Sequence, residues 1–89
     1  MTVTTSTIEV NVRYFAAARA AAGLDEETVS VAGGSTVTDL LATLRARGTE
    51  LAVVLDRCSF LCDGMAVRDA AKKLETNQTV DVLPPFAGG

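Results

Sequence analysis

The feature that most constrains this chain is the order in which its hydrophobic period changes. Residues 8–14 and 27–31 alternate apolar and polar side chains, which is the period of a half-buried strand. Apolar residues then recur through 37–44 at the spacing of one helix face, and residues 79–83 alternate again. Because a helix with one apolar face needs a surface to cover it, this order predicts a mixed sheet packed on one main helix.

Local signals place the ends of the helices. The alanine-rich residues 15–22 predict a short helix that stops at the glycine that follows. Ser35 or Thr36 caps the main helix over 37–44, and Gly48 is expected to end it.

The second half of the chain predicts a hairpin and a last strand. Residues 58–62 are rich in strand formers, and the Asp-Gly pair after them signals a tight turn into a short return strand over 65–67. Residues 69–76 are polar enough to run on the surface, while 51–55 fit either a short helical turn or a buried connection. The whole order of elements is that of an α+β roll of the β-grasp type.

Composition excludes several classes of function. The chain has 89 residues, which is room for one small domain, and 48% of them are apolar. The net charge of −3 is the wrong sign for binding nucleic acid. There is no histidine, so the commonest general base and the usual imidazole metal ligand are both missing. We expect no metal site and no catalysis by this chain on its own.

Cys58 and Cys62 are the two cysteines. On one strand their Cα atoms would be about 13 Å apart, whereas a disulfide requires less than about 7 Å. We therefore expect two reduced cysteines packed as small hydrophobic residues; a metal or redox pair is the alternative. No apolar run approaches the length of about 20 residues that spans a membrane, and no signal peptide precedes the domain, so a cytoplasmic protein without a membrane partner is expected.

The last six residues carry the chemistry that the rest of the chain lacks. We expect a folded domain over 1–83 and an extended tail over 84–89, with the sequence Pro-Pro-Phe-Ala-Gly-Gly. Two prolines hold a segment extended, and two glycines without Cβ atoms fit a channel too narrow for other residues. The α-carboxylate of Gly89 would then be the reacting group, carried into a partner by a tail made of Pro84, Pro85, Phe86, Ala87 and Gly88. A frayed terminus that happens to contain glycines is the alternative.

Three segments resemble the MoaD/ThiS family of ubiquitin-like sulfur carriers: 12–16 with its continuation to Arg19 and Gly23, the helix over 36–44, and 82–89. The resemblance spans almost the whole domain. The terminal Gly-Gly is shared by the family, and the preceding Pro-Pro is most similar to its molybdopterin synthase branch. Phe86 is bulkier than the aliphatic residue usual at that position, so its receiving pocket must be larger.

The resemblance implies a two-stage cycle. An adenylating enzyme similar to the ubiquitin-activating kind would use ATP and Mg²⁺ on the Gly89 carboxylate, and a sulfur donor enzyme would convert it to a thiocarboxylate. Two such carriers and two large subunits of molybdopterin synthase would form a heterotetramer that delivers sulfur to cyclic pyranopterin monophosphate. The chain itself would bind no cofactor.

The resemblance also places three residues at the partner interface. Phe15 and Leu83 match an apolar docking patch, although a core position at a strand end fits each equally well. Arg19 matches a helix position that is often basic or polar in the family and would be able to pair with an acidic partner surface; a solvated charge is the alternative.

Other pathways and classes remain open from the sequence. The same carrier chemistry would serve thiamine or cysteine biosynthesis. A ubiquitin-like modifier conjugated through Gly89 would have much the same sequence, and a β-grasp binding module would have a terminus without function.

Overall fold

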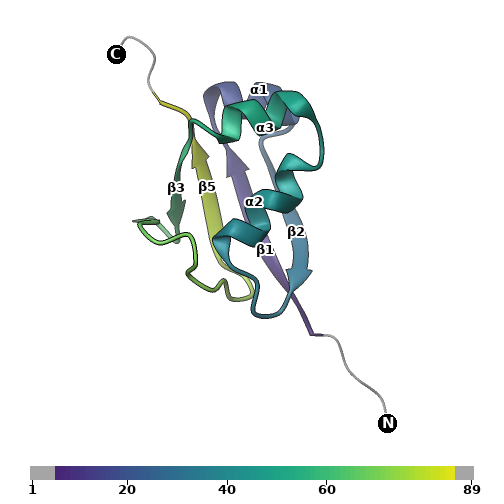
Figure 1. Ribbon diagram of the computed structural model, residues 1–89, viewed down its shortest axis with the longest axis vertical. Coiled ribbons are helices and arrows are strands. Elements are labelled where there is room, and N and C mark those ends of the chain that lie inside the picture. The colour runs from purple at the N-terminus through teal and green to yellow at the C-terminus, as the bar shows by residue number, and fades with distance from the viewer. Residues whose placement is uncertain (1–5, 86–89) are drawn as a thin grey trace.

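The computed structural model describes residues 6–85 as a five-stranded sheet with three helices (Figure 1). The elements run in the order β1 (Thr7–Tyr14), α1 (Ala16–Ala22), β2 (Glu26–Ala32), α2 (Val37–Arg45), α3 (Thr49–Leu55), β3 (Ser59–Cys62), β4 (Met65–Ala66) and β5 (Thr79–Leu83). The tail residues Phe86 to Gly89 lie outside the described residues, as does the segment 1–5.

The sheet has the strand order β2-β1-β5-β3-β4. Strand β1 pairs antiparallel with β2 and parallel with β5, and β5 pairs antiparallel with β3. Helix α2 crosses one face of the sheet, while α1 and α3 pack together at the end where β1 and β5 finish (Figure 1). This mixed sheet around one main helix confirms the predicted β-grasp roll.

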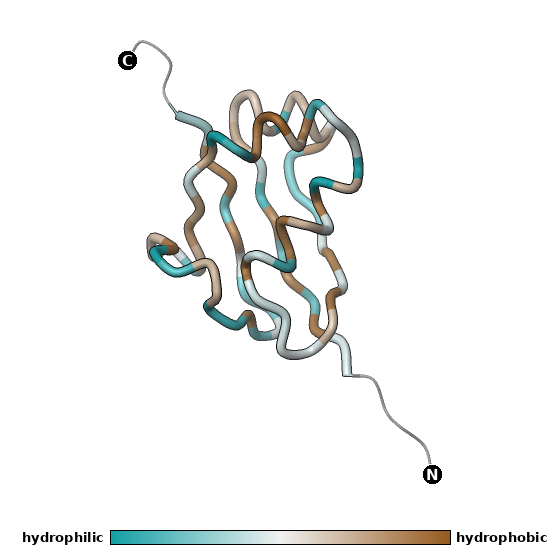
Figure 2. The backbone as a smooth tube through the Cα atoms, viewed as in Figure 1, coloured by the Kyte–Doolittle hydropathy of each residue, from teal (hydrophilic) through white to brown (hydrophobic). Residues whose placement is uncertain are grey.

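The core lies between α2 and the covered face of the sheet. Val10, Val12, Val80 and Val82 of the two central strands are fully buried there. Apolar and polar residues alternate along these strands, so brown and teal segments follow one another in the tube (Figure 2). The opposite face of the sheet carries polar side chains and the half-buried Leu61 and Leu83, and no helix of the described residues covers it.

Three local signals have the predicted geometry. The hydroxyl of Thr36 accepts a hydrogen bond from the backbone N–H of Asp39, and the Asp39 carboxylate accepts one from the N–H of Thr36, so the two form a capping box. Gly23 ends α1 in the left-handed conformation. Asp63 and Gly64 both have positive φ, as a type I′ hairpin turn requires, and they join β3 to β4.

Several element boundaries, and the burial of Leu74, differ from the prediction. Helix α2 ends at Arg45, and Gly48, which was expected to end it, instead precedes α3. Residues 51–55, for which the sequence fitted either a helical turn or a buried connection, are part of that helix. Strand β3 begins one residue after Cys58, because that residue still follows the turn that ends α3. Leu74 was expected on a surface segment but is buried. Its backbone N–H donates to the carbonyl of Ser35, and a β-bridge between Lys73 and Thr36 holds the segment beside the start of α2.

Both cysteines are reduced thiols packed at the core. Cys62 is buried, and the Cys58 thiol donates a hydrogen bond to the carbonyl of Val54. Burial raises the pKa of each thiol, which disfavours the reactive thiolate. These contacts fit the packing role expected for the two residues.

A polar cluster ties β1, β2 and the end of α2 together. The buried Tyr14 donates from its hydroxyl to Glu27 at 2.7 Å, and Arg47 forms an ion pair with the same carboxylate. Burial acts to raise the pKa of Glu27, but the hydrogen bonds from Arg47 and Tyr14 outweigh it and leave that pKa below its ordinary value. The charged carboxylate therefore stabilises the folded state.

We predict that Glu27→Gln lowers the free energy of unfolding by about 1 kcal/mol at neutral pH, because Tyr14 and Arg47 lose a charged acceptor. The folded pKa of Glu27 is depressed, so this contribution is present above the unfolded value of about 4.3 and is lost as pH falls through the folded value. Urea unfolding at pH 7 and at about pH 3 measures the difference, which should shrink in acid. The exposed neighbour Glu26→Gln is the matched control; a wild-type to Glu27→Gln difference that stays constant with pH would contradict the prediction.

Candidate functional site

The candidate site lies where β5 ends and the chain leaves the sheet. Leu83 and Pro84 are half-buried, and Pro85 is exposed. The segment leaves at the same end of the molecule as α1 and α3 (Figure 1). The sequence-predicted residues Phe86, Ala87, Gly88 and Gly89 follow directly and lie outside the described residues.

Phe15 lies at the surface beside the end of β5. Strands β1 and β5 are parallel with Tyr14 opposite Val82, so Phe15 and Leu83 are the next residues of neighbouring strands. The backbone N–H of Phe15 donates to the carbonyl of Val82 at 3.2 Å. The Phe15 side chain is 38% exposed and Leu83 is half-buried, so neither belongs to the core. The structure thus brings together the two residues expected in one apolar patch.

An ion pair lies on the sheet face beside this patch. Arg13 donates to both carboxylate oxygens of Asp81, from Nε at 2.7 Å and from Nη2 at 3.0 Å. Asp81 is only 6% exposed, and its hydrogen bond and charge raise the pKa of Arg13. The guanidinium carbon also lies 5.5 Å from the centre of the Phe15 ring, within cation–π range. The guanidinium of this ion pair therefore lies over the Phe15 ring, beside the end of β5.

Sequence reasoning did not single out Arg13 and Asp81. Both residues lie at polar positions of alternating strands, so the sequence predicts only that each side chain is on the polar face of the sheet. Their contact depends on the pairing of the first strand with the last, 68 residues away, and no local pattern specifies that pairing.

Arg19 has a partner within its own chain. Its Nε lies 3.6 Å from Asp25, and both side chains are more than half exposed. An exposed pair of this kind contributes little to stability. A partner protein would have to compete with Asp25 for this guanidinium.

The described residues near the end of β5 hold no constellation for acid–base or metal chemistry. Across residues 6–85, no three His, Cys, Asp or Glu side chains gather to hold a metal ion. None of the helices in that range is long and apolar enough to cross a membrane. The site consists of an apolar patch, the Arg13–Asp81 ion pair and the Pro-Pro segment at which the chain leaves the sheet. These features suit contact with another protein better than catalysis.

Comparisons with known proteins agree with this geometry. The model of the ThiS family matches residues 12–89. The curated molybdopterin synthase sulfur carrier subunit of Chlamydomonas reinhardtii is 34% identical over 83 residues, which cover 92% of this chain and all of the relative.

Two solved structures share the fold. The small archaeal modifier protein 1 of Methanosarcina acetivorans is 27% identical, with a TM-score of 0.78 over 94% of this chain and 99% of its own. A chain in the complex of subunits 1 and 2 of the molybdopterin-converting factor from Helicobacter pylori is 20% identical, with a TM-score of 0.70 over 92% of this chain and 100% of its own. On the extent of the family match and of the curated relative, this chain belongs to the ThiS/MoaD family of ubiquitin-like sulfur carriers.

Proposed function

We propose that this chain is the sulfur-carrying small subunit of a molybdopterin synthase. The observation that carries the proposal is its similarity, along the full length of the relative, to a molybdopterin synthase sulfur carrier subunit. The relative's name makes it one subunit of a synthase, and the fold also occurs in a complex of two molybdopterin-converting subunits. The partner we propose for this chain is accordingly the large subunit of the synthase.

The reacting group in this proposal is the α-carboxylate of Gly89. Its oxygen attacks the α-phosphorus of ATP on an adenylating enzyme, pyrophosphate leaves, and an acyl-adenylate forms. Hydrosulfide supplied by a donor enzyme then attacks the acyl carbon, AMP leaves and a proton is released, so Gly89 carries a thiocarboxylate and the sulfur stays at the sulfide level. The sulfur passes on to cyclic pyranopterin monophosphate inside the large subunit, and water restores the carboxylate.

The described residues supply direction and docking for this chemistry. Pro84 and Pro85 have fixed φ angles and carry the chain out of the sheet in a defined direction. Phe15 and Leu83 flank that exit and offer apolar area to a partner. ATP and Mg²⁺ belong to the adenylating enzyme in this scheme, and the acid–base groups belong to the large subunit.

A protein modifier is the second candidate. The observation that favours it is the shared fold and 27% identity with a small archaeal modifier protein. The same acyl-adenylate would then be attacked by an amine, and Gly89 would end in an isopeptide bond. Carriers for thiamine or cysteine biosynthesis differ from the first candidate only in the acceptor of the sulfur.

We predict that Gly89 gains one sulfur in place of one oxygen when the chain is incubated with ATP, Mg²⁺, the adenylating enzyme and a sulfur source. High-resolution mass spectrometry of the C-terminal peptide is required, since this exchange nearly coincides in mass with an oxidation. The matched control is Cys58→Ser with Cys62→Ser, which should still be loaded because the acceptor is a carboxylate. Sulfur on a cysteine and none on Gly89 would contradict the carrier mechanism.

Deleting Gly89 should abolish sulfur transfer and leave the melting temperature unchanged, because a terminal residue ordinarily contributes little to stability. Transfer is followed as formation of molybdopterin from cyclic pyranopterin monophosphate with the large subunit present. An equal loss of stability and of transfer would count against the proposal. Isopeptide conjugates in place of molybdopterin would favour the modifier.

Leu83→Asp should weaken binding to the large subunit by at least about tenfold, because it places a charge in the apolar patch beside Phe15. Isothermal titration calorimetry measures the affinity, and circular dichroism confirms that the variant is folded. Ser30→Asp is the matched control, since Ser30 is exposed on the same sheet face but lies on β2 opposite Glu9, away from Leu83. A folded Leu83→Asp variant with the affinity of the wild type would remove this patch from the interface.

A further inference from the structure

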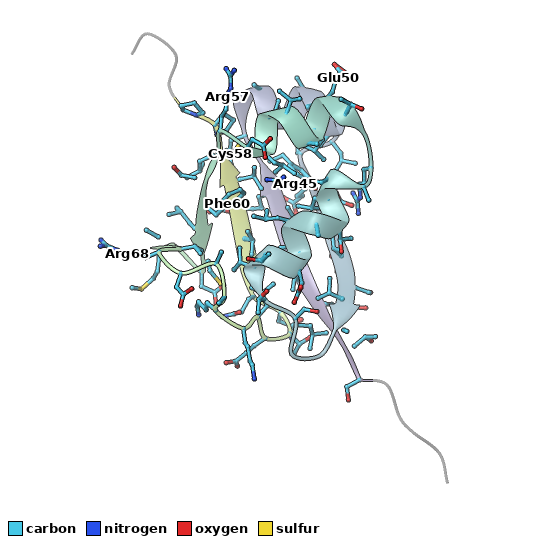
Figure 3. All side chains as sticks on the ribbon, viewed as in Figure 1. Arg45, Glu50, Arg57, Cys58, Phe60 and Arg68 are labelled. Carbon is cyan, nitrogen blue, oxygen red and sulfur yellow. The ribbon has the colours of Figure 1, made fainter. Side chains whose placement is uncertain are left out.

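Among the described residues, some arginines form ion pairs with carboxylates of the same chain and others do not. Of six in the sequence, four form ion pairs with carboxylates of the same chain: Arg13, Arg19, Arg45 and Arg47. Within residues 6–85, Arg57 and Arg68 have no such pair. Figure 3 shows these two far apart, Arg57 beside the exit of the C-terminal segment and Arg68 on the loop that follows β4.

Arg57 is one of the residues that line an apolar pocket of about 270 Å³. The pocket is lined by Ala17 of α1, by Val53 and Val54 of α3, by Arg57, and by Pro84 and Pro85. The acidic neighbour of Arg57 in the sequence is not available to it, because Asp56 forms an ion pair with Arg45. Among residues 6–85 the Arg57 guanidinium thus has no carboxylate partner, and it borders the apolar lining of the pocket.

The pocket continues along the groove between α1 and α3. A second hollow of about 460 Å³ shares Ala17, Val53 and Val54 with the first and extends towards Glu50. Val53 is 53% exposed on this groove, although it is an aliphatic residue in the middle of a helix. The helix side of the exit is therefore an apolar strip with a cation at the end nearest the C-terminal segment.

This strip is separate from the Phe15 and Leu83 patch. Leu83 lies on the sheet face turned away from α2, whereas Val53 belongs to the helices. Pro84 and Pro85 lie between the two surfaces, since they follow Leu83 and also line the pocket. A protein that receives the C-terminal segment would meet both surfaces at once.

Resting on the proposed function, we infer that the α1–α3 groove is a second docking surface for the large subunit of molybdopterin synthase, which places an apolar side chain in the pocket and a carboxylate on Arg57. Two features support this surface: it is continuous with Pro84 and Pro85, and it carries the positive charge of Arg57. The proline segment that leads into the large subunit forms one wall of the pocket. A partner that covers Arg57 without a carboxylate would bury an unpaired charge, which is costly, whereas a carboxylate can accept two hydrogen bonds from one guanidinium.

The test compares charge reversal at the two unpaired arginines in the full chain. Arg57→Glu and Arg68→Glu change the net charge equally, so any difference between them reports position. Titration calorimetry with the large subunit from the same organism should show affinity weakened by at least about tenfold for Arg57→Glu and by less than about twofold for Arg68→Glu. Arg57→Ala provides a second variant without a new negative charge, and circular dichroism checks that each is folded.

Each outcome decides the inference. If the wild-type chain binds the large subunit and Arg57→Glu binds equally well, the second docking surface is overturned and the proposed function stands. Equal weakening by both reversals would show a general charge effect and also overturn it. Failure of the wild-type chain to bind the large subunit overturns the proposed function, and the inference falls with it. A loss with Arg57→Glu that is confined to the adenylating enzyme would overturn the assignment of the partner.

Discussion

The parallel pairing of β1 with β5 is the constraint on which the rest of the structure depends. Asn11 lies opposite Thr79 and Tyr14 opposite Val82, so the two strands end at the same edge of the sheet. Because both strands run in the same direction, α1 begins where the C-terminal segment leaves. Val12 and Val80 fill the core on one face, while Arg13 and Asp81 join the strands on the other. Phe15 and Leu83, which we propose for docking, are neighbours only because this pairing holds.

The two surfaces around the exit differ in their electrostatics. On the sheet side, Arg13 is already satisfied by Asp81 and lies over Phe15, so that surface offers mainly apolar area and shape. On the helix side, Arg57 lacks an ion pair among the described residues and borders aliphatic side chains. Electrostatic complementarity discriminates between partners more than it adds affinity, so the helix side is suited to selecting the partner.

Most of the fold could be predicted because periodicity is a local property. The alternation in β1, β2 and β5, the Thr36 cap and the Asp-Gly turn each depend on residues close together in the sequence. Helix α3 was left open because its run Leu51–Leu55 is apolar at every position, which fits a helix and a buried connection alike. The end of α2 was placed too late, since Gly48 marks the start of the next helix.

The candidate site was predictable only in part, for a related reason. Phe15 and Leu83 were found through a resemblance, and their exposure required the tertiary structure. The partners of the charged residues lie beyond local patterns: Asp81 is far from Arg13 in sequence, and Arg47 reaches back to Glu27. The surroundings of Arg57 depend on the packing of α1 on α3 and on the position of Pro84 and Pro85. Neither can be predicted from the residues next to Arg57 in the sequence.

The pairing of the first strand with the last also sets the order of events during synthesis. Until β5 has been made, β1 has only β2 beside it and the centre of the sheet is missing. Contacts between distant parts of a chain close slowly, so folding of this domain is completed only after β5 has been made. A nascent chain cut short before β5 would lack the central strand of the sheet and, with it, Leu83, Pro84 and Pro85, so a truncated product cannot display these residues on an unfinished domain.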